Sequence, residues 1–221
     1  PVFRKSFPLF DEVVSAKLYT SGLGVYEAYL NGKRIGRKLE DGTMQYDELK
    51  PGSSEMGARK LYYTYDVTDM LAPRGQNVLS AVVTSGWWTG RIAANYGEKP
   101  AFLAKLILQY ADGTTRTIVT DSSWKSAMAS PVTFADIYDG ETYDARISTD
   151  WMLPSFDDSG WADVVGNTEF TGELVSGYAS TVVVRIDLER AVQSVAIYDG
   201  VTGNSTDAYG TVNVVRTADT G

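Results

Sequence analysis

Strand-like runs recur at intervals of about ten residues along this chain, and no helical stripe of comparable length interrupts them. The runs are residues 16–20, 25–30, 61–65, 78–83, 102–110 and 114–120, and turns rich in Gly, Asp, Asn and Pro separate them. Antiparallel strands can be joined by such short turns, whereas parallel strands need a long crossover that is usually a helix. The pattern therefore predicts an all-β, antiparallel jelly-roll sandwich.

Two hairpins are the most specific local features. Residues 102–110 alternate apolar side chains such as Leu106 with polar ones such as Lys105, which is typical of a strand with one buried face. A turn at Asp112–Gly113 then leads into the next run. The pair Asn31–Gly32 predicts a tight hairpin turn with positive φ. Both patterns favour antiparallel neighbours.

Histidine and cysteine are both absent from the 221 residues. The composition thereby excludes Ser-His-Asp and Cys-His nucleophiles, thiolate or imidazole zinc sites, and histidine proton shuttles. Any catalysis would depend on carboxylates, Lys, Tyr or Arg. A cysteine-free chain folds in oxidising and reducing compartments alike. We favour a secreted or periplasmic location, with the cytoplasm as the alternative.

The chain is acidic, with a formal charge of -8 and a pI near 4.6. These values argue against nucleic acids and anionic membranes as partners, because both attract basic surfaces. No apolar run approaches the roughly 20 residues of a membrane span. We therefore expect no nucleic acid and no membrane partner, and a neutral partner fits the charge better.

The composition of the sequence changes after residue 166. Residues 167–177 are mostly polar and contain glycine, and strand-like runs resume near residue 181. We expect residues 1–166 to form the sandwich and residues 167–221 to form a linker and the first strands of a following β-domain. Because the chain lacks an initiator Met, we also expect it to be a piece of a longer protein.

Five motifs occur in a fixed order along the chain. They are GVYEAYLNGKRIG at residues 24–36, YTYDVTDML at 63–71, SGWWTG at 85–90, DIYDGETYDAR at 136–146 and FDDSGW at 156–161. Together they resemble the N-terminal β-sandwich region of bacterial α-L-rhamnosidases of glycoside hydrolase family 78. The likeness covers residues 10–165. The last motif is the least specific, because accessory sandwiches of other glycosidases are similar there.

The resemblance implies a galactose-binding-like jelly roll that precedes a catalytic (α/α)6 domain in the same polypeptide. In such enzymes the barrel holds the carboxylates that act on terminal α-L-rhamnose with inversion. A helical domain of that kind would show as periodic apolar stripes, which this chain lacks. We therefore expect an accessory domain without catalytic residues of its own.

The first candidate site lies around the two tryptophans of the third motif. Some sandwiches of the family are carbohydrate-binding modules that hold terminal L-rhamnose through calcium. Aromatic rings pack on the apolar face of a sugar, while polar groups bind its hydroxyls. The candidate residues for carbohydrate binding are Trp87, Trp88, Arg91, Asn95 and Tyr96. The alternative is that one Trp fills the core and the other marks a domain interface.

The second candidate site is an acidic turn in the fourth motif. Asp139, Glu141 and Asp144 offer carboxylate oxygens of the kind that calcium prefers. Their spacing does not match an EF-hand loop. In the alternative interpretation, Arg146 pairs with one of the carboxylates and the cluster caps turns.

Three classes of function remain open. The first is an accessory domain that supports the catalytic domain of an α-L-rhamnosidase, with rhamnoside binding as an added role. The second is a stand-alone carbohydrate-binding module, and the third is a structural sandwich without a ligand. The loop between Gly90 and Tyr96 is short, which favours the third class over the second. The five ordered motifs favour the first class.

Overall fold

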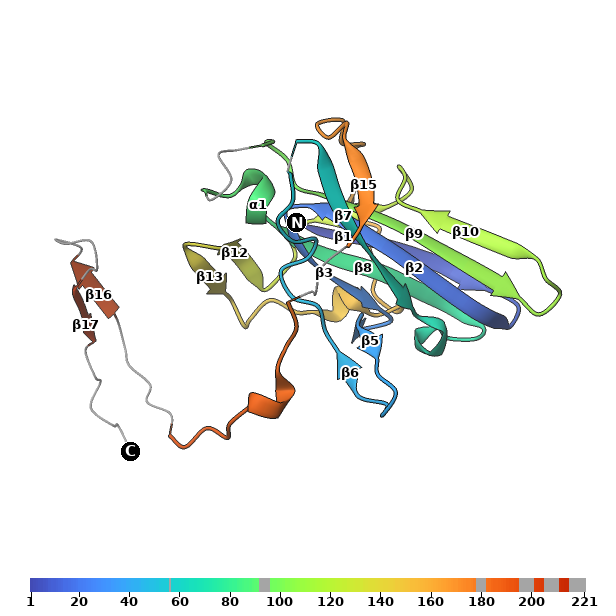
Figure 1. Cartoon of the computed structure of the whole chain (residues 1–221), viewed down its shortest axis with the longest axis horizontal. Helices are drawn as coiled ribbons and strands as arrows, with labels where there is room; N and C mark the ends of the chain where they lie inside the picture. Colours follow the sequence, from blue (N-terminus) through green and yellow to red (C-terminus); the bar gives the residue numbers. More distant parts are fainter. Residues whose placement is uncertain (56, 92–95, 178–181, 195–200, 205–210, 215–221) are drawn as a thin grey trace. The chain divides into compact units, whose positions relative to one another are not determined.

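The chain folds into two compact units, Pro1–Val184 and Arg185–Gly221. The computed structural model describes residues 1–55, 57–91, 96–177, 182–194, 201–204 and 211–214. In the second unit, η4 (Ile186–Leu188) is followed by the antiparallel pair β16 (Val201–Asn204) and β17 (Thr211–Val214). The first unit holds all the other elements (Figure 1).

Two large sheets form the first unit (Figure 1). One has the order β14-β11-β1-β8-β3-β4, with bounds Ala162–Asp163, Lys125–Ala127, Val2–Leu9, Gly75–Thr84, Val25–Leu30 and Lys33–Arg34. The other has the order β10-β9-β2-β7-β15, with bounds Thr115–Val119, Ala101–Tyr110, Val13–Leu23, Arg59–Asp66 and Glu173–Ser176. Of the pairs described in these sheets, β15 with β7 is parallel and the others are antiparallel.

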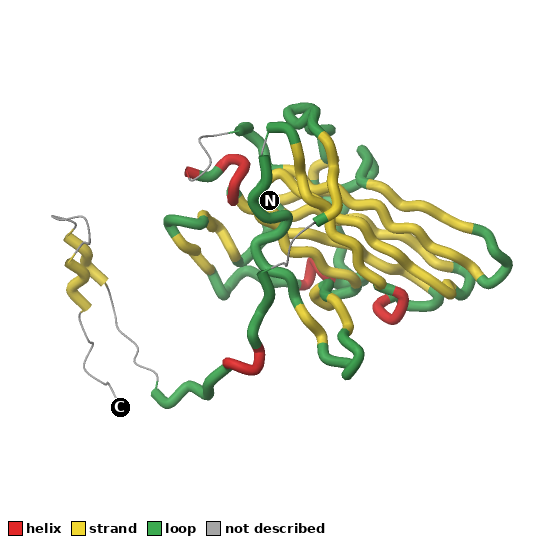
Figure 2. The backbone as a smooth tube through the Cα atoms, viewed as in Figure 1, coloured by secondary structure: helices red, strands yellow, loops and turns green. Residues whose placement is uncertain are grey.

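Smaller elements complete the first unit. They are the pairs β5 (Arg37–Lys38) with β6 (Met44–Gln45) and β12 (Val132–Asp136) with β13 (Gly140–Tyr143), and the short helices η1 (Thr68–Met70), α1 (Gly86–Thr89) and η3 (Asp150–Met152). Figure 2 shows how little of the chain is helical. In the described ranges, no helix is long and apolar enough to cross a membrane.

The core is built from the alternating faces of the strands. On β9, Leu106 and Leu108 are buried while Lys105 and Gln109 are exposed, as the alternation predicted. Strands of both sheets supply the other buried apolar side chains, among them Phe7, Leu18, Ala28, Tyr65, Leu79 and Val83. The predicted antiparallel sandwich is therefore confirmed.

The turn predicted at Asn31–Gly32 joins β3 to β4. Asn31 has φ of 52° and Gly32 has φ of 80°, which a two-residue hairpin turn of this kind requires. Nδ2 of Asn31 donates to Asn77 Oδ1 at 2.7 Å and to the carbonyl of Met70 at 3.0 Å. Oδ1 of Asn31 accepts the N–H of Val78 at 2.9 Å. The turn is thus tied to the neighbouring strand β8.

Residues 167–184 belong to the first compact unit. β15 adds to the edge of β7, and the N–H of Glu48 donates to the carbonyl of Val182 at 2.8 Å. An isolated bridge joins Asp47 to Val183. The boundary expected after residue 166 stays a prediction, and the division into compact units suggests a second position after Val184.

Limited digestion with thermolysin distinguishes the two boundaries. Residues 185–194 are exposed throughout, so we expect the first cuts there, leaving a resistant fragment that ends near Val184. Mass spectrometry over a time course identifies the fragment. A first cut within residues 167–177 would instead support the boundary after residue 166.

Candidate functional site

Trp88, on α1, is packed on both faces and is only 1% exposed. Its ring stacks on Tyr96 at a centroid distance of 6.4 Å and meets Phe170 edge-on at 6.3 Å. The ammonium of Lys60 lies 4.6 Å from the centroid of the Trp88 ring, and burial lowers the pKa of Lys60 to about 8. A sugar cannot stack on a ring whose surroundings are already filled. The structure therefore supports the core interpretation for Trp88.

The indole N–H of Trp88 is held by Glu169, which the sequence analysis did not single out. Nε1 donates to Oε2 of Glu169 at 3.2 Å, and the same oxygen accepts the N–H groups of Glu98 and Lys99 at 3.0 and 3.3 Å. Burial acts to raise the pKa of Glu169, but these hydrogen bonds outweigh it and lower the pKa. A Cβ at Gly97 would lie 2.2 Å from Nε1, so this close approach requires glycine.

Two other residues of the first candidate patch are more accessible. Trp87 is half-buried, and Tyr96 is 51% exposed while it stacks on Trp88. Asn95 lies outside the described residues. Among the residues of this patch that the structure describes, Trp87 and Tyr96 are thus the rings with surface left for a ligand.

Arg91 links the first candidate patch to the second. Its Nη2 lies 2.9 Å from Oδ1 of Asp139, and its backbone N–H donates to Oδ2 of Asp136 at 3.1 Å. Its guanidinium carbon lies 5.7 Å from the centroid of the Tyr138 ring. The structure therefore places the end of α1 against the β12–β13 hairpin, and Arg91 is the connection.

Two of the three carboxylates proposed for calcium pair with different arginines. Asp139 pairs with Arg91, and Asp144 accepts hydrogen bonds from Nε and Nη2 of Arg146 at 2.8 and 2.7 Å, which lower the pKa of Asp144. Glu141 lines a hollow beside β3. In the part of the chain that the structure describes, no group of three or more acidic side chains is placed to hold a metal ion. These residues therefore do not fit a calcium site, and the pairing with Arg146 was the better interpretation.

A hollow of about 600 Å³ lies between β3 and the β12–β13 hairpin, and we call it the β3 hollow. Its lining combines aromatic rings with carboxylates and an arginine, including Tyr29, Tyr143, Trp151, Glu27, Glu48, Asp136, Glu141 and Arg34. Rings that cover an apolar face and charged groups that bind hydroxyls are the chemistry of sugar recognition. The volume is also in the range of small-molecule sites.

Four charged side chains form a connected network beside the β3 hollow. Glu27 pairs with Arg34 and with Lys50, which is only 1% exposed. Arg34 Nη2 also lies 2.5 Å from Oε1 of Glu48. Burial acts to lower the pKa of Arg34, but the hydrogen bonds to the two carboxylates outweigh it and raise the pKa. The carboxylates are therefore fixed in place and still present lone pairs to the hollow.

Two N–H groups that border the β3 hollow are buried without an acceptor in the described part of the chain. They are Nε of Arg34 and Nε1 of Trp151. Trp151 is 3% exposed and meets the Tyr29 ring edge-on at 5.9 Å. Leaving a buried donor unsatisfied costs about 1–3 kcal/mol. Both atoms are covered by the protein itself, so the candidate site rests on the aromatic and charged lining of the hollow and not on these donors.

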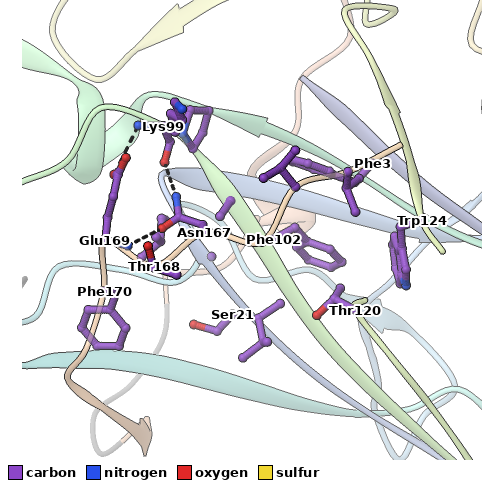
Figure 3. A pocket seen from close by; sticks show the side chains of 18 of the residues that line it. Phe3, Ser21, Lys99, Phe102, Thr120, Trp124, Asn167, Thr168, Glu169 and Phe170 are labelled. Atoms are coloured by element: carbon purple, nitrogen blue, oxygen red, sulfur yellow. Dashed lines mark hydrogen bonds between the residues drawn. The ribbon is translucent and has the colours of Figure 1, made fainter. Parts of the chain in front are cut away.

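A second hollow of about 600 Å³ is lined by the start of β9 and by residues 164–170 (Figure 3). Several of its polar groups bond to one another. Nδ2 of Asn167 donates to the carbonyl of Lys99 at 3.2 Å, and the N–H of Glu169 donates to Oδ1 of Asn167 at 2.8 Å. Because these groups already have partners, we assign the second hollow to packing and not to recognition.

The sequence analysis missed the residues of the β3 hollow. The one available signal was the alternation in β3, where Tyr26 is buried and Glu27 is only partly covered. That alternation shows that Glu27 faces away from the core. It does not show that Trp151, more than a hundred positions later, folds over the same face.

Comparison with known proteins gives the family. The family model described as the alpha-L-rhamnosidase N-terminal domain matches residues 11–185. An alpha-L-rhamnosidase of Streptomyces avermitilis is 44% identical over 169 residues, which are 74% of this chain and 15% of that protein. An alpha-L-rhamnosidase of Alteromonas sp. (strain LOR) is 38% identical over 177 residues, which are 78% of this chain and 18% of that protein.

Solved structures agree with the sequence comparison. The Streptomyces avermitilis alpha-L-rhamnosidase complexed with L-rhamnose has a TM-score of 0.70 and 40% identity, and the match covers 79% of this chain and 17% of that one. The native enzyme of Aspergillus terreus has a TM-score of 0.67 and 36% identity, with 79% and 20% covered. The chain thus spans less than a quarter of the length of these relatives. It belongs to the alpha-L-rhamnosidase N-terminal domain family, as the five motifs indicated.

Proposed function

We propose that this chain is a non-catalytic accessory domain of a longer α-L-rhamnosidase, in which it supports the catalytic domain. The observation that carries the proposal is the match of most of the chain to an N-terminal domain that makes up only 15–18% of the curated relatives. The rest of such a protein has ample length for a separate catalytic domain.

The arrangement of the charged side chains in the β3 hollow also favours a supporting, non-catalytic role. An inverting glycosidase needs an acid and a base about 6.5–9.5 Å apart that are free to exchange protons around a sugar and a water. Glu27 and Glu48 are instead bound to the same guanidinium, that of Arg34. Two carboxylates that share one guanidinium lie on the same side of it and do not face each other across a space for a sugar and a water.

Hydrolysis of a chromogenic L-rhamnoside tests the proposal. We expect no turnover by the 221-residue chain above that of a matched blank, and turnover by the full-length polypeptide at equal molar concentration. Glu27→Gln in the chain is the control for trace activity. Turnover by the chain that this substitution abolishes would show that the domain itself is catalytic.

A second role, carbohydrate binding, is favoured by the aromatic rings and charged side chains that line the β3 hollow. L-rhamnose has a methyl group that an aromatic ring can cover and hydroxyls that the carboxylates and N–H groups can bind. A monosaccharide has few atoms to bury, so we expect a dissociation constant on the order of 0.1–1 mM.

Calorimetric titration with L-rhamnose separates the candidate sites. Trp151→Phe keeps an aromatic ring but replaces the larger indole that lines the hollow, so we expect binding to weaken severalfold with the fold unchanged. Trp161→Phe, in another loop, is the matched control and should bind normally. Calcium and a chelator should have no effect, because the described carboxylates do not form a cation site.

Two outcomes of the titration would change this picture. An absence of heat at millimolar sugar would leave the supporting role alone. The other outcome is binding that needs calcium, or binding that is abolished by Trp87→Phe and not by Trp151→Phe. Either result would assign the site to the Trp87–Tyr96 patch.

A further inference from the structure

The β12–β13 hairpin stands apart from both large sheets. In the described part of the chain its two strands pair only with each other, and all four residues of β13 are exposed. Figure 1 shows the hairpin beside α1, away from the stacked strands. A two-stranded hairpin is at best marginally stable in water by itself. Its surroundings must therefore supply part of its stability.

The hairpin carries large apolar rings on its surface. Phe134 is 46% exposed and Tyr138 is 64% exposed, and neither lines the β3 hollow. Tyr143, which does line the hollow, is 58% exposed. Tyr143 therefore belongs to the hollow, and Phe134 and Tyr138 are the exposed rings of the hairpin outside it, of the kind that marks an interaction surface.

The body of the domain holds the base and the tip of the hairpin in place. The N–H of Asp144 donates to the carbonyl of Pro131 at 2.8 Å and closes the base. At the tip, Arg91 binds Asp139 by its side chain and Asp136 by its backbone. The outer face with Phe134 and Tyr138 is thus presented in a defined position.

We propose that the outer face of the hairpin, with Phe134 and Tyr138, docks on the larger part of the same polypeptide. This rests on the proposed function, because it presumes that this chain is the N-terminal domain of a longer enzyme. A covalent tether gives the two parts an effective concentration near the millimolar range, so a small patch suffices. The match covers 15–18% of the length of these relatives, so 82–85% of each relative lies outside the matched domain.

The charges of the hairpin and of the whole chain bear on the docking partner. Asp139 and Asp144 pair with Arg91 and Arg146, while Asp136 and Glu141 line the β3 hollow. Phe134 and Tyr138 therefore fit an apolar partner surface. A symmetric contact with a second copy would bring together two chains of charge -8 each. The larger part of the same polypeptide is the better occupant.

Hydrogen exchange measured by mass spectrometry tests the docking without any substitution. We expect peptides from residues 132–143 to exchange about tenfold or more slowly in the full-length polypeptide than in the 221-residue chain. Peptides from β9 should exchange alike in both. Equal exchange of residues 132–143 in the two proteins overturns the proposal. Protection in the 221-residue chain that grows with its concentration would identify a second copy as the occupant instead.

A pair of variants gives an independent test. Phe134→Ser with Tyr138→Ser should leave the thermal midpoint of the 221-residue chain unchanged and lower that of the full-length polypeptide by at least about 3 °C. Phe10→Ser removes a ring that is 73% exposed elsewhere and is the matched control. An equal effect of both changes in the full-length polypeptide contradicts the docking. L-rhamnoside turnover of the full-length polypeptide is measured in parallel. If that polypeptide is active but its hairpin is not protected, the docking proposal is wrong while the proposed function still holds.

Discussion

Replacing Arg4 with methionine should lower the free energy of unfolding by about 3 kcal/mol, the largest effect of any charged residue outside the β3 hollow. Arg4 is 1% exposed and lies on β1, under the loop that contains η3. Its guanidinium donates to the carbonyls of Trp151, Leu153 and Phe156 at 2.9, 3.0 and 3.2 Å. It also pairs with Asp158. Methionine fills similar space but removes a donor from all four of these acceptors and from Oγ of Ser6.

Thermal or denaturant unfolding of the variant measures this loss. A loss of that size should lower the thermal midpoint by roughly 6–12 °C. Lys5→Met, at the next position, removes only two exposed hydrogen bonds, both to Ser123, and should change stability by less than about 0.5 kcal/mol. Arg4→Lys should fall in between, because an ammonium cannot reach acceptors on several sides at once. Equal stability of Arg4→Met and Lys5→Met would contradict this role for Arg4.

The second large effect is expected at Trp88, where substitution by alanine should cost about 3–5 kcal/mol. The change removes a buried ring from between Tyr96, Phe170 and Lys60 and leaves Glu169 without one of its donors. The reason is packing, so the loss should appear in the absence of any sugar.

Trp87→Ala is the matched comparison, because the neighbouring ring is only half-buried. We expect a clearly smaller loss of stability than for Trp88→Ala, measured by denaturant unfolding with an unchanged m-value. Trp88→Phe should lose about 1 kcal/mol, since it keeps the ring contacts and gives up the hydrogen bond to Glu169. If Trp87→Ala were the more damaging change, the assignment of Trp88 to the core would be wrong.

The fold could be predicted because its signals are local. The alternation of Leu106 with Lys105 depends on a strand period of two and on nothing distant. The positive φ that Asn31–Gly32 favours is a property of those two residues. Both features lie in hairpins whose partners follow directly in the sequence. The family was also accessible, since the five motifs keep their order along the chain.

The site could not be predicted, because it depends on residues that are distant in the sequence. Glu27 and Trp151 both line the β3 hollow although they are more than a hundred positions apart, and no periodicity links them. Trp87 and Trp88 are identical neighbours, so composition cannot tell which of them is buried. Gly86, the first residue of α1, has φ of 47°, and a Cβ there would lie 2.5 Å from Val25, so α1 begins in close contact with β3. This contact is visible only once β3 is in place beside the helix.

The central claim, that this domain supports a catalytic domain elsewhere in the same polypeptide, is tested most directly by deleting residues 1–184 from the full-length enzyme. Activity on a small aryl L-rhamnoside and the thermal midpoint are measured for both proteins. We expect the shortened enzyme to keep its turnover at low temperature and to lose at least about 4 °C in thermal midpoint. An unchanged midpoint would contradict the supporting role, and loss of turnover in a folded protein would show that the domain contributes catalytic groups.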